Sequence, residues 1–206
     1  MRPPALAYSG SCMTRQQRFD VHPVPTSPWV ISTRELGRSP GVMCRYRRQI
    51  PAPADFKLEI IGVAEGRPIQ LRLRFESAIE GVFVSGSADV EVVGECARCL
   101  EPLSYPLTVS FGELFAYPDS VTDATTEPDE VSRVVDEMVD VEDLVRDAVL
   151  LALPLAPLCR DDCRGLCPDC GERWVDLDLG HSHETLDARW AALEGWLTST
   201  DDADIV

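Results

Sequence analysis

Six of the eight cysteines fall in two short clusters, and no other feature of the chain limits its fold as strongly. The first cluster is the pair Cys96 and Cys99, and the second spans residues 159–170. The N-terminal residues have no apolar stretch of signal-peptide length, so we expect a cytoplasmic protein. Because disulfides are rare in the cytoplasm, the clusters indicate a metal site or a redox pair.

A zinc site explains the second cluster better than a redox pair does. The segment from Cys167 to Gly171 has the form of a zinc knuckle, a tight turn whose backbone N–H groups point at two thiolates. A redox pair should open a helix among basic groups that lower the thiol pKa. Here Asp161, Asp162 and Asp169 surround the cysteines and disfavour a thiolate unless a cation is bound.

The spacing allows more than one set of four ligands, and a third possibility is that no metal is tightly held. The preferred set is local and consists of Cys159, Cys163, Cys167 and Cys170. A rival set uses Cys96 and Cys99 in place of the first two, as two facing knuckles. His181 and His183 are close enough to replace a ligand, but we interpret them as solvated residues. Zinc bound by four thiolates is coordinatively closed, which indicates a structural role.

Apolar and charged residues alternate with a period of two in the middle of the chain, which is typical of half-buried strands. One face of the clearest example carries Ile69, Leu71, Leu73 and Phe75. Residues 56–63, 82–85, 88–93 and 103–115 read as further strands. We therefore predict an α+β fold whose antiparallel β-rich core, a meander or a small barrel, occupies residues 54–117.

Charge divides the chain at about residue 50. Residues 1–50 hold eight arginines and two acids, a net charge of +6, whereas residues 51–206 carry −22. We expect residues 1–53 to form an extended Pro/Arg-rich arm whose Arg45, Arg47 and Arg48 are candidate RNA contacts. The acidic body repels phosphate, which disfavours binding to DNA and favours a basic protein as the partner.

The remaining segments read as a loop, two helices and a tail. Residues 118–139 form an acidic loop, and Asp140 is placed to cap a helix whose apolar positions recur at helical spacing. Residues 184–197 predict a C-terminal amphipathic helix, and residues 199–206 an acidic tail. No apolar run reaches the roughly 18–20 residues that cross a bilayer, so no membrane contact is expected.

An ordered series of motifs resembles the YceD-like family of large ribosomal RNA subunit accumulation proteins, in its Gram-positive form. The series consists of Glu95-Cys96-Ala97-Arg98-Cys99-Leu100-Glu101, the helix 141–151 leading to Cys159, the knuckle 165–171 and the closing segment 186–193. The resemblance covers about residues 55–197. It implies a role in the accumulation or maturation of large-subunit (23S) ribosomal RNA. Some family members lack the Cys167 and Cys170 knuckle, which implies that metal is optional in the family.

Together these observations favour a ribosome-biogenesis factor without catalysis. It would bind a basic ribosomal protein or a large-subunit assembly intermediate, and zinc would hold its structure. The competing hypotheses are a thiol oxidoreductase that uses Cys167 and Cys170, a magnesium-dependent nuclease that uses the acidic residues, and a zinc-dependent regulatory protein with DNA affinity. The absence of a phosphate-binding glycine loop or a nucleophile with a histidine partner in the sequence disfavours an enzyme.

Overall fold

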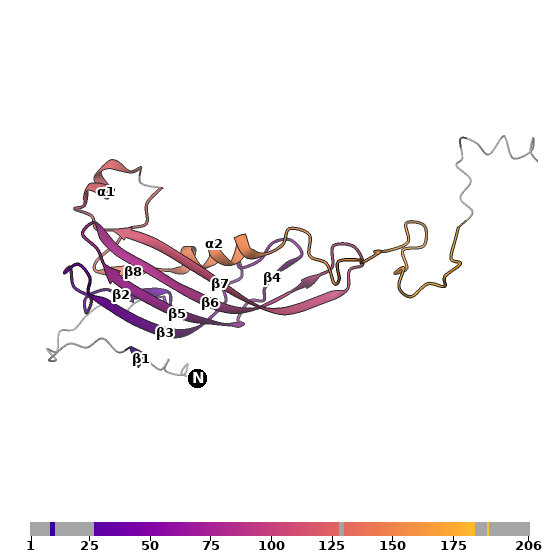
Figure 1. Ribbon diagram of the computed structural model, residues 1–206, viewed down its shortest axis with the longest axis horizontal. Helices are drawn as coiled ribbons and strands as arrows, with labels where there is room; N and C mark the ends of the chain where they lie inside the picture. Colours follow the sequence, from indigo (N-terminus) through magenta and orange to yellow (C-terminus); the bar gives the residue numbers. More distant parts are fainter. Residues whose placement is uncertain (1–8, 11–26, 128–129, 184–188, 190–206) are drawn as a thin grey trace, which may run out of the picture.

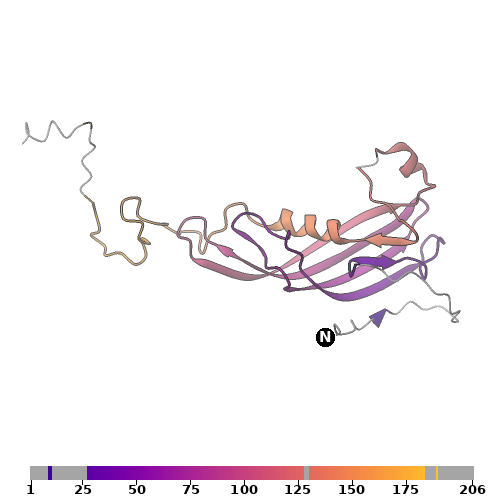
Figure 2. The ribbon, with the colours of Figure 1, turned by 180° about the vertical axis from the view of Figure 1, so that it is seen from behind.

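The computed structural model describes residues 9–10, 27–127, 130–183 and 189 (Figure 1). These residues form an open, antiparallel sheet covered on one face by a helix and a two-stranded ribbon (Figures 1 and 2). The predicted α+β class is confirmed. Of the two predicted arrangements of the core, the structure has the open meander and no closed barrel.

The main sheet contains six strands, and β6 lies at its centre. The strands are β1 (Ser9–Gly10), β3 (Met43–Pro51), β4 (Ile61–Val63), β5 (Pro68–Ser77), β6 (Gly81–Glu95) and β7 (Pro102–Ala116). β7 pairs with β6 along its whole length. On its other side, β6 pairs with β5 from Val82 to Asp89 and with β4 from Val92 to Gly94. The β6–β7 hairpin therefore extends well beyond the end of β5.

Residues 27–53, which we expected in an extended arm, lie inside this fold. They supply β3, which pairs with β5 over nine residues, and β2 (Val30–Ser32), which pairs with β8 (Met138–Asp140). The inward side chains of β3 include the buried Cys44, Tyr46 and Ile50. Burial of these apolar side chains is the physical reason that the segment is folded, since it stabilises the sheet.

Within the described residues, one long helix, α2 (Glu142–Ala152), lies on the inner face of the sheet and packs against β7. Its Val145 and Val149 are fully buried in the core. Asp140 accepts a hydrogen bond from the Glu142 N–H at 3.0 Å, although the N-cap residue itself is Val141. None of the helices in the described ranges has the length and apolar character that crossing a membrane requires.

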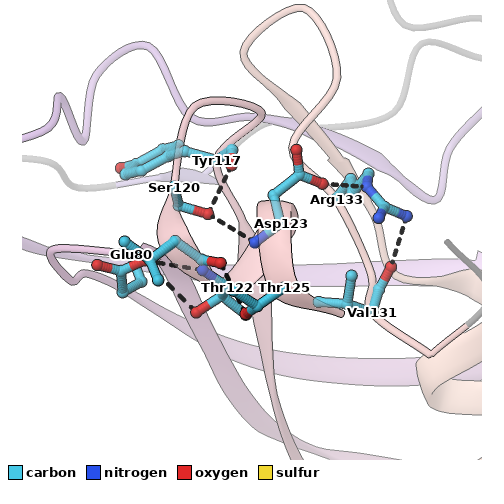
Figure 3. Close-up of polar contacts among 9 residues, drawn as sticks. Glu80, Tyr117, Ser120, Thr122, Asp123, Thr125, Val131 and Arg133 are labelled. Atoms are coloured by element: carbon cyan, nitrogen blue, oxygen red, sulfur yellow. Dashed lines mark hydrogen bonds and ion pairs between the residues drawn. The ribbon is translucent and has the colours of Figure 1, made fainter. Parts of the chain in front are cut away.

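The segment that we expected to be a flexible acidic loop contains a short helix, α1 (Val121–Thr125). Figure 3 shows how it is held: the Ser120 hydroxyl oxygen accepts from the Asp123 N–H, and Glu80 accepts from the Thr122 N–H. Arg133 closes the loop through an ion pair with Asp123. Some of the acidic residues of this loop, such as Asp123, thus form local contacts. The predicted C-terminal helix 184–197 and tail 199–206 lie outside the described residues, apart from residue 189.

Candidate metal centre

The turn between β6 and β7 has the backbone form of a zinc knuckle. The Cys96 N–H donates to the Glu101 carbonyl at 2.8 Å, and the Leu100 N–H donates to the Cys96 carbonyl at 3.0 Å. Leu100 takes the left-handed conformation, with φ of 59°, that usually favours glycine. This tight turn places the side chains of Cys96 and Cys99 on one side of the hairpin tip.

The chain that leaves α2 returns to this turn and is fixed against it. The Ala97 N–H donates to the Pro157 carbonyl at 2.7 Å, and the Arg98 guanidinium donates to the Cys163 carbonyl at 2.8 Å. Gly165 has φ of +78°, and a Cβ at this position would lie 3.0 Å from the Arg98 carbonyl oxygen. Only glycine suits this close approach, which carries the chain past the hairpin tip.

Four sulfur atoms converge between these two segments. The Sγ atoms of Cys96 and Cys163 are 3.8 Å apart, those of Cys99 and Cys159 are 3.6 Å apart, and all four lie within 4.8 Å of one another. A tetrahedral zinc site with bonds of about 2.3 Å has sulfur–sulfur edges of about 3.8 Å. Cys159 is exposed and the other three are buried. The described sulfur positions therefore fit a tetrahedral, closed metal site.

The surroundings of Cys96, Cys99 and Cys159 push the pKa values of these three thiols apart. Burial acts to raise the pKa of Cys96, but backbone N–H groups of Arg98, Cys99 and Cys159 outweigh it and lower this pKa to about 6. Burial and the neighbouring thiols raise the pKa of Cys99. Cys159 is exposed as a residue, but desolvation of its thiol and the neighbouring thiols raise its pKa to about 12. Several thiolates in one small volume require a cation, which a divalent metal ion would supply.

This grouping differs from both predicted ligand sets. The structure gathers neither the local set, Cys159, Cys163, Cys167 and Cys170, nor the rival set, Cys96, Cys99, Cys167 and Cys170. It divides the local set instead, because the Arg98 and Ala97 contacts hold the chain around Cys163 at the hairpin tip. Cys167 and Cys170 lie in a separate group with His181 and His183. Spacing along the sequence carries no signal for a contact between residues 60 positions apart.

The six clustered cysteines are free, but Cys44 on β3 is disulfide-bonded, contrary to the expectation that disulfides are rare in this chain.

The three candidate RNA contacts, Arg45, Arg47 and Arg48, all lie on β3 but do not share one face of the sheet. Arg45 and Arg47 project from the outer face of the sheet, because they alternate with buried residues. Arg48 instead donates hydrogen bonds to the carbonyls of Pro28 and Val30, at 2.8 and 3.3 Å, and so holds β2 in place.

Comparison with known proteins gives a family match over much of the fold. Residues 84–196 match the family described as large ribosomal RNA subunit accumulation protein YceD. This range includes both cysteine clusters, α2 and most of the β6–β7 hairpin. No solved structure matches the chain.

Relatives cover most of the chain. An uncharacterized protein of Mycobacterium tuberculosis, Rv2926c, is 46% identical over 192 residues, which cover 93% of this chain and 92% of the relative. An uncharacterized protein of Mycobacterium leprae is 42% identical over 94% of this chain and 91% of its own length. The uncharacterized protein YlbN of Bacillus subtilis is 28% identical over 66% of this chain and 78% of its own length.

Proposed function

Because the chain belongs to the family of large ribosomal RNA subunit accumulation proteins, YceD, we propose that it is a non-catalytic cytoplasmic factor that supports accumulation of large-subunit ribosomal RNA. The family match carries this proposal. In it, zinc bound by Cys96, Cys99, Cys159 and Cys163 has a structural role, since four thiolates leave no open coordination position for water or substrate.

An acidic surface around α2 supports a basic protein as the partner. Arg146 is the centre of a group of carboxylates and forms ion pairs with Asp55, Asp143 and Asp147. The single positive charge of this guanidinium does not neutralise the three carboxylates. Burial and repulsion from neighbouring carboxylates accordingly raise the pKa of Glu142. A cationic partner on this surface would relieve that repulsion.

Apolar side chains adjoin this acidic surface at the end of α2. Leu151 and Leu155 are 87% and 88% exposed, an unusual state for two leucines so close together. An apolar contact bordered by carboxylates is complementary to a protein segment that carries both leucine-like and lysine- or arginine-rich faces. Ribosomal proteins and their assembly partners provide the basic chemistry that this surface would recognise.

The opposite face of the sheet offers a surface for RNA phosphates. Arg45 and Arg47 on β3 lie directly across from Arg74 and Arg72 on β5. Arg72 and Arg74 pair with acidic neighbours, but Arg45 and Arg47 form no ion pair with another described residue. Beside them is a depression of about 430 Å³ lined in part by Gln49 and Gln70. Guanidinium and amide donors at such spacing suit an anionic, hydrogen-bonding ligand.

A depletion strain tests the central proposal. We expect the ratio of large- to small-subunit ribosomal RNA to fall, with precursor particles accumulating in sucrose gradients. A normal ratio after full depletion would contradict the function.

A pull-down over a salt gradient tests the basic partner. It uses the full chain, because β3 lies before residue 51 and is part of the sheet. Leu151→Asp should lose a basic ribosomal protein that the wild type retains at low salt. Leu179→Asp is the matched control, because Leu179 is also fully exposed but lies beyond both cysteine segments. Equal recovery by both variants would contradict the proposed surface.

A further inference from the structure

The Cys167–Gly171 turn repeats the backbone of the Cys96–Leu100 knuckle. The Cys167 N–H donates to the Glu172 carbonyl at 2.7 Å, and the Gly171 N–H donates to the Cys167 carbonyl at 2.9 Å. These are the same two hydrogen bonds, at the same spacing, that close the first knuckle. Gly171 has φ of +76°, at the position that Leu100 occupies in the first turn.

The flanking residues repeat as well. Leu166 and Arg173 form an antiparallel bridge around the second turn, as Glu95 and Pro102 do around the first. The chain thus builds the same small hairpin twice, and each hairpin presents two cysteines at its tip. Figures 1 and 2 show that the second hairpin extends from the end of the β6–β7 hairpin, away from the sheet.

Two histidines complete the group at the second tip. The Cys170 Sγ lies 3.6 Å from the His181 Nε2, which in turn lies 2.8 Å from the His183 Nε2. The four ligand atoms, including the Cys167 Sγ, all lie within 4.8 Å of one another. The indole of Trp174 packs edge-on against His181, with ring centroids 5.7 Å apart, and so helps to position the imidazole.

We propose that Cys167, Cys170, His181 and His183 form a second zinc site, separate from the four-cysteine centre. Two thiolates and two imidazoles are a donor set that tetrahedral Zn²⁺ prefers, and the ion would neutralise the two thiolates. The repeated knuckle and the convergence of both imidazoles are independent observations that indicate the same ligand. The site closes a loop from residue 167 to residue 183, a segment without a helix or a long strand.

The two sites differ in their protection from solvent. Three of the four cysteines of the first centre are buried, whereas Cys170 and His183 are exposed and His181 is half-buried. Cys96, Cys99 and Cys163 of the first centre form a small hydrophobic cluster, to which no ligand of the second site belongs. A chelator therefore removes the ion of the second site first. Loss of this ion releases residues 167–183 while the sheet stays folded.

Metal stoichiometry of the full-length protein, by native mass spectrometry and elemental analysis, tests the proposal. The wild type should carry two zinc ions, and His181→Asn/His183→Asn should carry one. His22→Asn, at the remaining histidine of the chain, is the control for loss of an imidazole and should carry two. One ion or none in the wild type, or two ions in the double variant, would overturn the proposal.

Cobalt substitution gives a second readout that does not depend on retained zinc. Thiolate-to-cobalt charge-transfer absorption scales with the number of cobalt–sulfur bonds, six with both sites filled and four with the first alone. The double variant should therefore lose about one third of this absorption, with an unchanged far-ultraviolet circular dichroism spectrum from the sheet. If the double variant absorbs as strongly as the wild type, the second site is contradicted. If its cobalt spectrum shows no four-sulfur site although the sheet is intact, the two sites are not separate and the proposal is contradicted as well.

Discussion

Replacing Arg45 and Arg47 with glutamine should make the protein more stable and its binding to RNA weaker. Each arginine lies directly opposite another arginine on β5, and a like-charged cross-strand pair destabilises a sheet by roughly 0.2–1 kcal/mol. Asp89 and Glu76 already neutralise Arg72 and Arg74 in part, at 2.8 and 2.6 Å. The lower half of that range, about 0.2–0.6 kcal/mol, applies to each pair, so the double variant should gain about 0.4–1.2 kcal/mol in free energy of unfolding.

The effect on RNA binding has a size that follows from counterion release. Each lost phosphate contact to single-stranded RNA lowers the slope of log affinity against log salt by about 0.7, so two contacts lower it by about 1.4. Urea unfolding measures the stability, and fluorescence anisotropy with a large-subunit RNA fragment at several salt concentrations measures the slope. An unchanged slope, or a loss of stability, would refute the assignment of this face to phosphate.

Arg38→Gln is a matched control for this experiment. Arg38 pairs with Asp119 at 3.1 Å and lies over the ring of Tyr117, so its loss should lower stability by less than about 1 kcal/mol. Because Arg38 is not on β3 or β5, the salt slope should stay at the wild-type value. A fall in slope equal to that of the double variant would show that general charge, rather than the outer face of the sheet, attracts RNA.

Three further predictions concern the metal centre, the core and the acidic surface. Gly165→Ala should destabilise by about 1 kcal/mol more in thermal unfolding than Gly37→Ala; both residues have positive φ, but a Cβ has open space only at Gly37. Val149→Ala should lower the free energy of unfolding by about 1–3 kcal/mol, whereas Leu151→Ala should change it by less than about 0.5 kcal/mol in the same urea titration. The raised pKa of Glu142 means that its carboxylate destabilises the fold at pH values above the raised pKa, so Glu142→Gln should stabilise the protein at pH 7 and lose this gain as the pH falls through the raised pKa to the carboxyl's ordinary value of 4.5; a gain independent of pH would contradict the raised pKa.

The alternation of residue types predicted β5 correctly but failed for its neighbour β3. Both strands bury every second residue, but β3 carries Arg48 at an inward position between Tyr46 and Ile50. The arginine is accommodated because its long side chain reaches the carbonyls of Pro28 and Val30. A pattern of residue types does not contain this contact, so the strand reads as part of a basic, irregular segment.

The cysteines show a similar limit of local reasoning. The knuckle form of residues 167–171 is evident in the sequence, because Pro168 and Gly171 specify the turn. The partners of Cys96 and Cys99 are not evident, since they depend on where α2 returns the chain relative to the β6–β7 turn. Cys167 and Cys170 group with His181 and His183, which in the sequence alone read as solvated residues. The rival ligand set already treats both pairs as knuckles, although Leu100 stands in the first turn where glycine stands in the second.

Charge in the folded protein is distributed by face rather than by segment. The division at residue 50 predicts a basic arm attached to an acidic body. In the structure, Arg45 and Arg47 join Arg72 and Arg74, from beyond that division, on one face of the sheet. The carboxylates around Arg146 lie on the opposite side with α2. The described residues thus carry a basic and an acidic surface on opposite sides of one sheet, as the proposed RNA and protein partners require.

The four-cysteine centre also ties together two distant parts of the chain. Cys99 and Cys159 are 60 positions apart, and the segment between them includes β7, α1, β8 and α2. A permanent cross-link that closes a loop of this length restricts the unfolded chain by about 4 kcal/mol. A metal ion imposes the same restriction reversibly, only while it is bound. The half-life of the chain in the cell would then follow the supply of zinc, as that of a secreted domain follows the oxidation of its disulfides.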